Sequence, residues 1–279
     1  MPAIVPKRSI ALAEEDRKSL DDVARDHVKI VLDACHFNRT NAARVLGIDR
    51  KTLAHYIRRW GIEFPAEQRR LAVGSLVAIE GIDGSGISTQ ARALVDYLVR
   101  HDHPAMMTAE PSSGAVGQLL RKLLAPGAMA PSASSLRILA LLFAADRLDH
   151  FQRVVAPALA KGTTVISDRW YHSSLAYQRT AIDRDWIMAL HRHTRAPDVT
   201  VFLAVKPETG IARRAAIGRR QEYFHDVAVQ REVVNGYRAT IAELRSEGER
   251  IEIVDGEPDV QTVTADVVRA LGLGRKPAR

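Results

Sequence analysis

The residues best suited to chemistry lie in the segment 79–90, which reads IEGIDGSGISTQ. Its glycines allow the backbone to form a nest of N–H groups, and such a nest at the start of a helix binds polyphosphate. An apolar run precedes the segment and a helical pattern follows it, which is the setting of a phosphate-binding loop. The Ser88 hydroxyl stands where such loops bind Mg²⁺. We predict nucleotide contacts from Gly81, Gly84, Ser85, Gly86, Ile87, Ser88 and Thr89.

Ile87 departs from the loop pattern G-x-x-x-x-G-K-[ST], in which a lysine occupies this position. The lysine would reach the β- and γ-phosphates and follow the charge into the transition state, which an isoleucine cannot do. The backbone donors of the loop remain. Nucleotide binding is therefore predicted separately from phosphoryl transfer, which we expect to be weak or absent.

Five apolar runs separated by helical patterns follow residue 75, and this alternation is typical of an α/β domain. We expect a parallel sheet with helices on both faces over residues 76–270. Ligands bind beyond the carboxyl ends of such strands, where the loop, Glu110 and Asp168 are expected. The predicted strands are residues 76–80, 105–109, 163–167, 199–205 and 250–254.

A small all-α domain is predicted in front of the sheet, at residues 20–62. Around it we expect a flexible arm at 1–19, a linker at 63–75 and, after the sheet, a basic tail at 271–279. The first helix should cover residues 20–35, because apolar residues, with one histidine among them, recur there near a 3.6-residue period. These are Val23, His27, Ile30, Val31 and Ala34.

Two shorter helices should follow the first. Thr40 is expected to cap one helix, which Gly47 ends because glycine tolerates the left-handed conformation. Asp49 is expected to cap a third helix, from Arg50 to about Trp60. Two short helices joined by a glycine turn, the second of them basic, predict a helix-turn-helix whose second helix enters the DNA major groove.

The string NRTNAARVLGIDRKTL at residues 38–53 resembles the Fis-type DNA-binding domain of bacterial enhancer-binding activators. The resemblance covers residues 20–62. It implies a homodimer made by the first helix, with two recognition helices on two half-sites of double-stranded DNA. A basic helix that is merely solvated is the alternative. The residues implied to face DNA are Arg50, Lys51, Thr52, His55, Arg58 and Arg59.

The second domain resembles thymidylate kinase, a P-loop nucleoside monophosphate kinase. Three strings carry the resemblance, which extends over nearly all of residues 75–265: LFAADR at 142–147, PALAKG at 157–162 and SSLAYQ at 173–178. It implies the reaction of ATP with dTMP to give ADP and dTDP, with Mg²⁺ as cofactor. It also implies a nucleotide partner even where the reaction is lost.

Roles for single residues follow from this resemblance and from side-chain chemistry. Arg169 offers a planar fork to the phosphate of a nucleoside monophosphate. Asp168, with Ser88, is expected in the Mg²⁺ shell. Asp83 resembles the family's acidic residue near the acceptor sugar and phosphate. With Arg147, which can bind the base edge or the phosphate, Asp83, Asp168 and Arg169 are the catalytic candidates.

The rest of the acceptor site is implied in the same way. Phe143 can stack on the acceptor base, and Tyr177 and Gln178 resemble the family's thymine-reading pair. A basic run falls where the family places its mobile lid, and its arginines could stabilise the transferring phosphoryl group or simply be solvated. The run consists of Arg213, Arg214, Arg219 and Arg220.

Several positions besides Ile87 depart from the family pattern. Ala109 stands where the family has an arginine, and Ala204 where it has an aspartate. Ser112 and Ser113 replace two glycines, and Arg179 replaces a glycine after Gln178. With Ile87 and Ala109, two cationic side chains that serve phosphoryl transfer are missing.

Composition sets outer limits on function. The chain of 279 residues has a net charge of +7, which favours polyanionic partners such as nucleotides or nucleic acid. Its single cysteine, Cys35, allows no disulfide within the chain and suits a reducing cytoplasm. No apolar run reaches the ~18 residues of a membrane span, so no membrane partner is expected.

Three functions remain open on the sequence. The first, which we favour, is a DNA-binding, regulatory protein whose kinase-like domain binds a nucleotide. The second is an active dTMP kinase with an accessory DNA-binding domain. The third keeps the fold as an interaction scaffold without a ligand.

Overall fold

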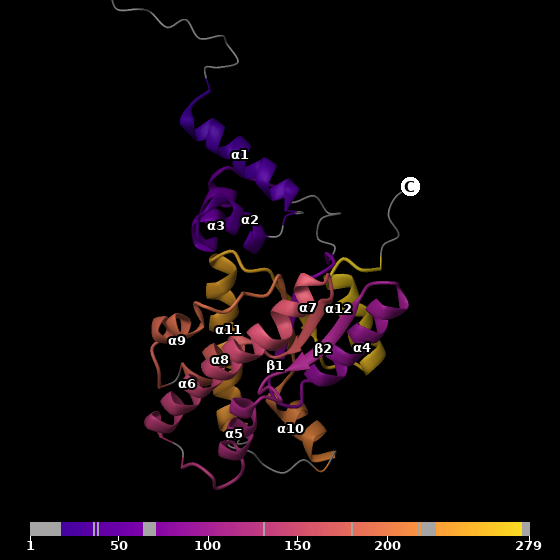
Figure 1. The fold of residues 1–279 in the computed structure, drawn as a ribbon. Helices are drawn as coiled ribbons and strands as arrows, with labels where there is room; N and C mark the ends of the chain where they lie inside the picture. Colours follow the sequence, from indigo (N-terminus) through magenta and orange to yellow (C-terminus); the bar gives the residue numbers. More distant parts are fainter. Residues whose placement is uncertain are drawn as a thin grey trace, which may run out of the picture. The chain divides into compact units, whose positions relative to one another are not determined.

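A computed structural model describes residues 18–35, 37, 39–63, 71–130, 132–179, 181–216, 218 and 227–274. The chain divides into two compact units, Met1–Glu63 and Phe64–Arg279 (Figure 1). Most of the expected arm, the middle of the expected linker and the end of the expected tail lie outside the described residues, as do Arg219 and Arg220 of the basic run.

The first unit consists of helices α1 (Leu20–Ala34), α2 (Arg39–Leu46) and α3 (Arg50–Arg59). The first predicted helix is confirmed, and Val31 is buried among the residues whose period predicted it. Val23 and Ile30 are 50% and 65% exposed, whereas Val28 and Leu32 are buried beside Val31. Helix α1 packs against α2.

The turn between α2 and α3 has the predicted form. Gly47 has a φ of +67°, the left-handed conformation expected of a glycine that ends a helix. Asp49 caps α3 by accepting the N–H of Thr52 at 2.9 Å. The prediction for Thr40 was wrong, because α2 already begins at Arg39 and Thr40 therefore lies inside its first turn.

The second unit is built on a five-stranded parallel sheet with the order β2-β3-β1-β4-β5. All five predicted strands are confirmed, with ends that differ by one residue or less. The strands are β1 (Leu76–Gly81), β2 (Ala105–Ala109), β3 (Thr164–Asp168), β4 (Val199–Ala204) and β5 (Ile251–Asp255).

Helices cover both faces of this sheet (Figure 1). Among the described residues, no helix has the length and apolar character needed to cross a membrane. The helical segments are α4 (Ile87–Arg100), α5 (Ala115–Leu123), α6 (Ala133–His150), a π-helical turn (Phe151–Val155), α7 (Ala156–Ala160), α8 (Tyr171–Gln178), α9 (Arg184–His191), α10 (Pro207–Ala216), α11 (Val227–Ser246) and α12 (Val260–Ala270).

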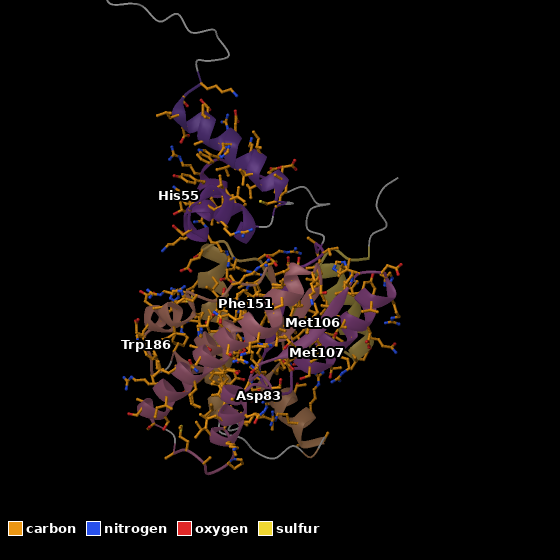
Figure 2. All side chains as sticks on the ribbon, viewed as in Figure 1. His55, Asp83, Met106, Met107, Phe151 and Trp186 are labelled. Atoms are coloured by element: carbon orange, nitrogen blue, oxygen red, sulfur yellow. The ribbon has the colours of Figure 1, made fainter. Side chains whose placement is uncertain are left out.

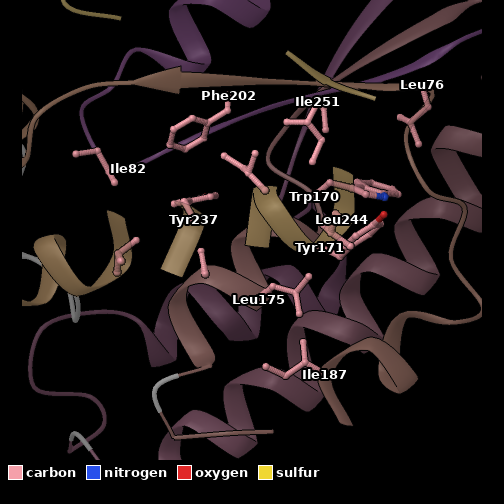
Figure 3. Close-up of a cluster of buried hydrophobic side chains, with 14 of the residues drawn as sticks. Leu76, Ile82, Trp170, Tyr171, Leu175, Ile187, Phe202, Tyr237, Leu244 and Ile251 are labelled. Carbon is pink, nitrogen blue, oxygen red and sulfur yellow. The ribbon is translucent and has the colours of Figure 1, made fainter. Parts of the chain in front are cut away.

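Strand β1 is buried on both faces and divides the apolar core in two. Leu76 and Ala78 point into a cluster completed by α8 and α11, which Figure 3 shows around Trp170 and Tyr237. Val77 and Ile79 point to the other face, into a cluster completed by α4 and α12. Strands buried on both faces explain the continuous apolar runs in the sequence.

Candidate functional site

The glycine-rich loop lies between the end of β1 and the start of α4, beyond the carboxyl end of the central strand. Gly84 shows why this loop needs glycine. Its φ is +82°, and a Cβ there would lie 2.1 Å from the carbonyl oxygen of Gly210. Helix α10 thus packs directly against the loop, and no side chain fits between them.

A pocket opens above the loop, and the predicted magnesium ligands meet in it. The Ser88 hydroxyl, at the start of α4, donates a hydrogen bond to Oδ2 of Asp168, at the end of β3. A hydroxyl and a carboxylate are hard oxygen ligands of the kind that Mg²⁺ prefers, so these residues fit the ion that the family uses. Asp83 lines the same pocket.

Ile87 supplies no polar group to this pocket. Its side chain is 6% exposed and belongs to the apolar cluster of β1, α4 and α12. The cationic side chains that line the pocket come from elsewhere: Arg169 after β3, and Arg213 and Arg214 on α10. Arg213 donates to the carbonyl oxygens of Gly256 and Glu257 at 2.8 and 2.7 Å, so its guanidinium is held beside the loop after β5.

A second pocket adjoins the first and gathers the predicted acceptor residues. The two pockets share Asp83 and Arg169. Because both pockets are lined by these two residues, a group bound at the junction would be close to both pockets. The second pocket is lined by Asp83, Glu110, Pro111, Leu124, Phe143, Arg147, Arg169, Ser173, Ser174, Tyr177 and Gln178.

Arg169 is the centre of this junction. Its backbone has a φ of +73°, in the left-handed region that non-glycine residues rarely adopt. One guanidinium nitrogen, Nη2, is 2.5 Å from Oδ1 of Asp83. The other, Nη1, donates to the Gly81 carbonyl and to Ser173 Oγ, both at 3.0 Å. Burial disfavours the charged guanidinium and by itself lowers the pKa of Arg169. Electrostatic interactions with Tyr177, Tyr237 and Asp83 have the larger combined effect, and they raise this pKa well above its ordinary value.

Arg147 is buried at the base of the second pocket, with 1% of its surface exposed. Its Nε donates to Glu110 Oε2 at 2.7 Å, and Nη1 lies 3.3 Å from Ser174 Oγ. Nη1 also lies 3.1 Å from the ring nitrogens of His191. Burial and the positive charge of Arg147 lower the pKa of His191 to about 2, so this imidazole is neutral at physiological pH.

Gln178 leaves an acceptor atom ready in the same pocket. The residue is 2% exposed, and within the described part of the chain its Oε1 has no hydrogen-bond partner. A buried polar atom without a partner is costly, which favours a ligand donor at this position.

Two of the residues that depart from the family pattern have structural partners. Ser112 donates through its N–H and its hydroxyl to the carboxylate of Asp146, at 2.7 and 2.5 Å, and so anchors the turn beside the second pocket. Arg179 pairs with Glu243 of α11 at 3.0 Å. Neither substitution blocks the pocket, since neither residue lines it.

Sequence reasoning missed several residues that hold this site. Glu110 was noted only for its place after a strand, and its ion pair with Arg147 was not predicted. Glu80, Tyr237 and His191 were not singled out, and Tyr237 and His191 contact the site from distant parts of the chain. The signal available for Glu80 was an acidic residue in an otherwise apolar strand.

In the first unit, the DNA-facing candidates separate into two groups. Lys51, His55 and Arg58 are exposed at spacings of four and three residues, so they share one face of α3; Figure 2 marks His55. Thr52 instead donates its hydroxyl to Asp49 at 2.7 Å, and Arg59 pairs with Asp21 of α1 at 2.8 Å. Arg50 is partly exposed at the first position of the helix.

The sheet order and the glycine loop at the central strand define a P-loop kinase fold, with two adjoining pockets beside the loop. The family model for thymidylate kinase matches residues 79–267. This chain therefore belongs to the thymidylate kinase family. A second model, described as bacterial regulatory protein, Fis family, matches residues 19–60, so the N-terminal unit is a Fis-type helix-turn-helix domain.

Similar proteins match about 70% of this chain and nearly all of their own length. A "Probable thymidylate kinase" of Thermococcus gammatolerans is 36% identical over 201 residues, which are 70% of this chain and 95% of the relative. A "Probable thymidylate kinase" of Pyrococcus abyssi is 36% identical over 70% of this chain and 94% of its own. A "Thymidylate kinase" of Ruegeria pomeroyi is 37% identical over 70% of this chain and 92% of its own.

Proposed function

We propose that this chain is a DNA-binding, regulatory protein whose thymidylate kinase-like domain binds a nucleotide but transfers phosphoryl groups slowly or not at all. The observation that carries the proposal is the burial of Ile87 in the apolar core, where the loop pattern requires a lysine. Removing one preorganised charged contact costs ~3–4 kcal/mol of barrier, or roughly two to three powers of ten in rate.

Nucleotide binding is supported by the parts of the site that remain. The loop keeps its backbone donors, and Ser88 with Asp168 suits the Mg²⁺ that accompanies ATP. The acceptor pocket offers the fork of Arg169 for a phosphate and the free Oε1 of Gln178 for a base N–H. dTMP or a closely related nucleotide is the ligand that we propose for it.

DNA binding is supported by the distribution of charge. Basic and acidic residues are equal in number between residues 76 and 270 and also within the linker at 63–75, so the excess positive charge lies in the N-terminal arm, the helix-turn-helix domain and the tail. Within the first unit, the exposed face of α3 carries Lys51, His55 and Arg58. We propose that this face enters the major groove of double-stranded DNA, in a cytoplasmic protein that regulates transcription.

We also propose a homodimer, because helix-turn-helix proteins read two half-sites. Two exposed apolar surfaces support it. On α1, Leu20, Val23 and Ile30 are at least half exposed. On α6, Ile138 and Leu141 are 46% and 50% exposed.

Fluorescence anisotropy with a labelled duplex, at several salt concentrations, tests DNA binding. Affinity should fall steeply with salt, and Arg58→Ala should lower it and reduce the salt slope by about one. Arg59→Ala is the matched control, since Arg59 is engaged with Asp21 and should matter less. Binding that does not depend on salt or on Arg58 would contradict the proposal.

An active dTMP kinase is the second candidate. It is favoured by the acceptor pocket and by Arg213 and Arg214, which line the loop pocket and could replace the missing lysine. A coupled assay for ADP with dTMP separates the two proposals, because ordinary kinase turnover is ~1–100 per second. Calorimetric titration with ATP and with dTMP separates both from a scaffold that binds neither.

A further inference from the structure

The guanidinium of Arg169 is held by buried polar side chains next to the acceptor pocket. Besides its contact with Ser173, Nη1 donates to the Tyr237 hydroxyl at 3.2 Å. The hydroxyls of Ser173 and Tyr237 donate to the same atom, Oε2 of Glu80, at 2.6 and 2.8 Å. Two parallel paths, each of two hydrogen bonds, therefore connect the guanidinium to a buried carboxylate.

Glu80 also holds the backbone that follows Arg169. Its Oε1 accepts the N–H of Trp170 at 2.7 Å and that of Ser173 at 3.4 Å. These N–H groups belong to the start of α8, where no side chain of the helix itself provides a cap. Because Arg169 precedes this turn with a left-handed backbone, the Glu80 carboxylate fixes both the course of the chain and the hydroxyls that bind its side chain.

Tyr237 comes from α11, far from Arg169 in sequence, and is 1% exposed (Figure 3). Burial and the neighbouring Glu80 raise the pKa of its hydroxyl well above the ordinary value, so the group stays protonated and can donate to Glu80 while it accepts from Arg169. The phenol ring packs in the apolar cluster around Phe202, which limits its movement.

We propose that Tyr237 and Glu80 are positioning residues for the phosphate of the acceptor nucleotide. They hold the Nη1 edge of Arg169 in place before a phosphate binds. Binding therefore does not cost the conformational entropy of this side chain. The inference rests on the proposed binding of a nucleoside monophosphate in the pocket that Arg169 lines. It adds a residue from α11 and one from β1 to a site otherwise built by the ends of strands and by α8.

The test compares two buried tyrosines. Tyr237→Phe removes the hydroxyl that contacts Arg169, and Tyr171→Phe removes one that donates to a different buried carboxylate, Glu249. Each protein is titrated with thymidine and with dTMP, and the ratio of the two affinities reports phosphate binding alone. We expect this ratio to fall about tenfold in Tyr237→Phe, as for one hydrogen bond to a charged group, and to stay unchanged in Tyr171→Phe.

An unchanged ratio in Tyr237→Phe, or an equal fall in both variants, would overturn the inference. Glu80→Gln should lower the ratio as Tyr237→Phe does, with thymidine affinity retained. Failure of the proposed function gives a different result, because the wild-type protein would then bind dTMP no better than thymidine.

A measurement without ligand tests the inference in that case. NMR should show slow rotation of the Arg169 guanidinium in wild type and Tyr171→Phe, and fast rotation in Tyr237→Phe. Equal rotation in all three proteins contradicts the inference.

Discussion

At the scale of single residues, Ile87 is the position at which our proposal separates nucleotide binding from phosphoryl transfer. Ile87→Lys should raise the rate of ADP formation with dTMP by about two to three powers of ten, because the cation can follow charge into the transition state. The aliphatic stem of lysine can keep the packing that Ile87 makes with β1 and α12.

Ile87→Met is the matched control for this substitution, since it has a similar length and no charge. The coupled assay and calorimetry with ATP should show a gain in Ile87→Lys alone. If neither rate nor ATP affinity changes in Ile87→Lys, the missing lysine is not what limits the loop.

His191 makes the second unit sensitive to acid. Its folded-state pKa of about 2 lies below the ordinary value of 6.5, so the unfolded chain binds the proton first as pH falls. The free energy of unfolding should therefore decrease below pH ~6.5, by about 1.4 kcal/mol per pH unit from this group. Urea unfolding at several pH values measures the slope, which His191→Gln should reduce and the exposed control His193→Gln should not. An unaltered slope in His191→Gln would contradict this assignment.

The sequence identified single functional groups better than their partners. Asp83, Asp168 and Arg169 could be proposed from a motif and a resemblance, and the structure gathers them around the junction of the two pockets. Their supports, such as Tyr237 and His191, could not, because hydrogen bonds between distant segments depend on how helices pack. Thr52 and Arg59 show the same limit, since their local partners make them less available to DNA than their types suggest.

At the scale of elements, two helix caps allow the two units to be perturbed separately. Asp49 and Asp259 each accept the N–H and the hydroxyl of a threonine three residues later, at the starts of α3 and α12. Replacing either with alanine should cost about 1 kcal/mol of stability in its own unit, because one cap is lost.

The functional consequences of these substitutions should be opposite. Asp49→Ala should weaken duplex binding and leave ATP binding intact, whereas Asp259→Ala, which alters the lining of the loop pocket, should do the reverse. Calorimetric melting with anisotropy and ATP titration gives all three quantities. Loss of ATP binding in Asp49→Ala would show that the two units are not independent.

Strands were easier to predict than helix faces. Strands β1, β3 and β4 are almost entirely buried, and the edge strands β2 and β5 are partly exposed, but short apolar runs marked all five. Helix α1 has apolar residues on two faces, and periodicity alone could not show which of them packs against α2. Val23 and Ile30, which contributed to the period that predicted this helix, are exposed.

At the scale of the whole molecule, one chain joins a basic helix-turn-helix domain to a charge-balanced kinase fold. The relatives named above align with about 70% of the chain, so the helix-turn-helix domain is an addition to their common part. The altered loop and the additional Fis-type domain are the two features on which our proposal of a regulatory, nucleotide-binding protein rests.

The steady-state rate of ADP formation from ATP and dTMP, in a preparation that binds duplex DNA, tests this account most directly. With the loop cation missing, we predict a turnover at least two powers of ten below the ~1–100 per second of ordinary kinases. Turnover within that range, from the unaltered chain with Ile87 in place, would contradict the account.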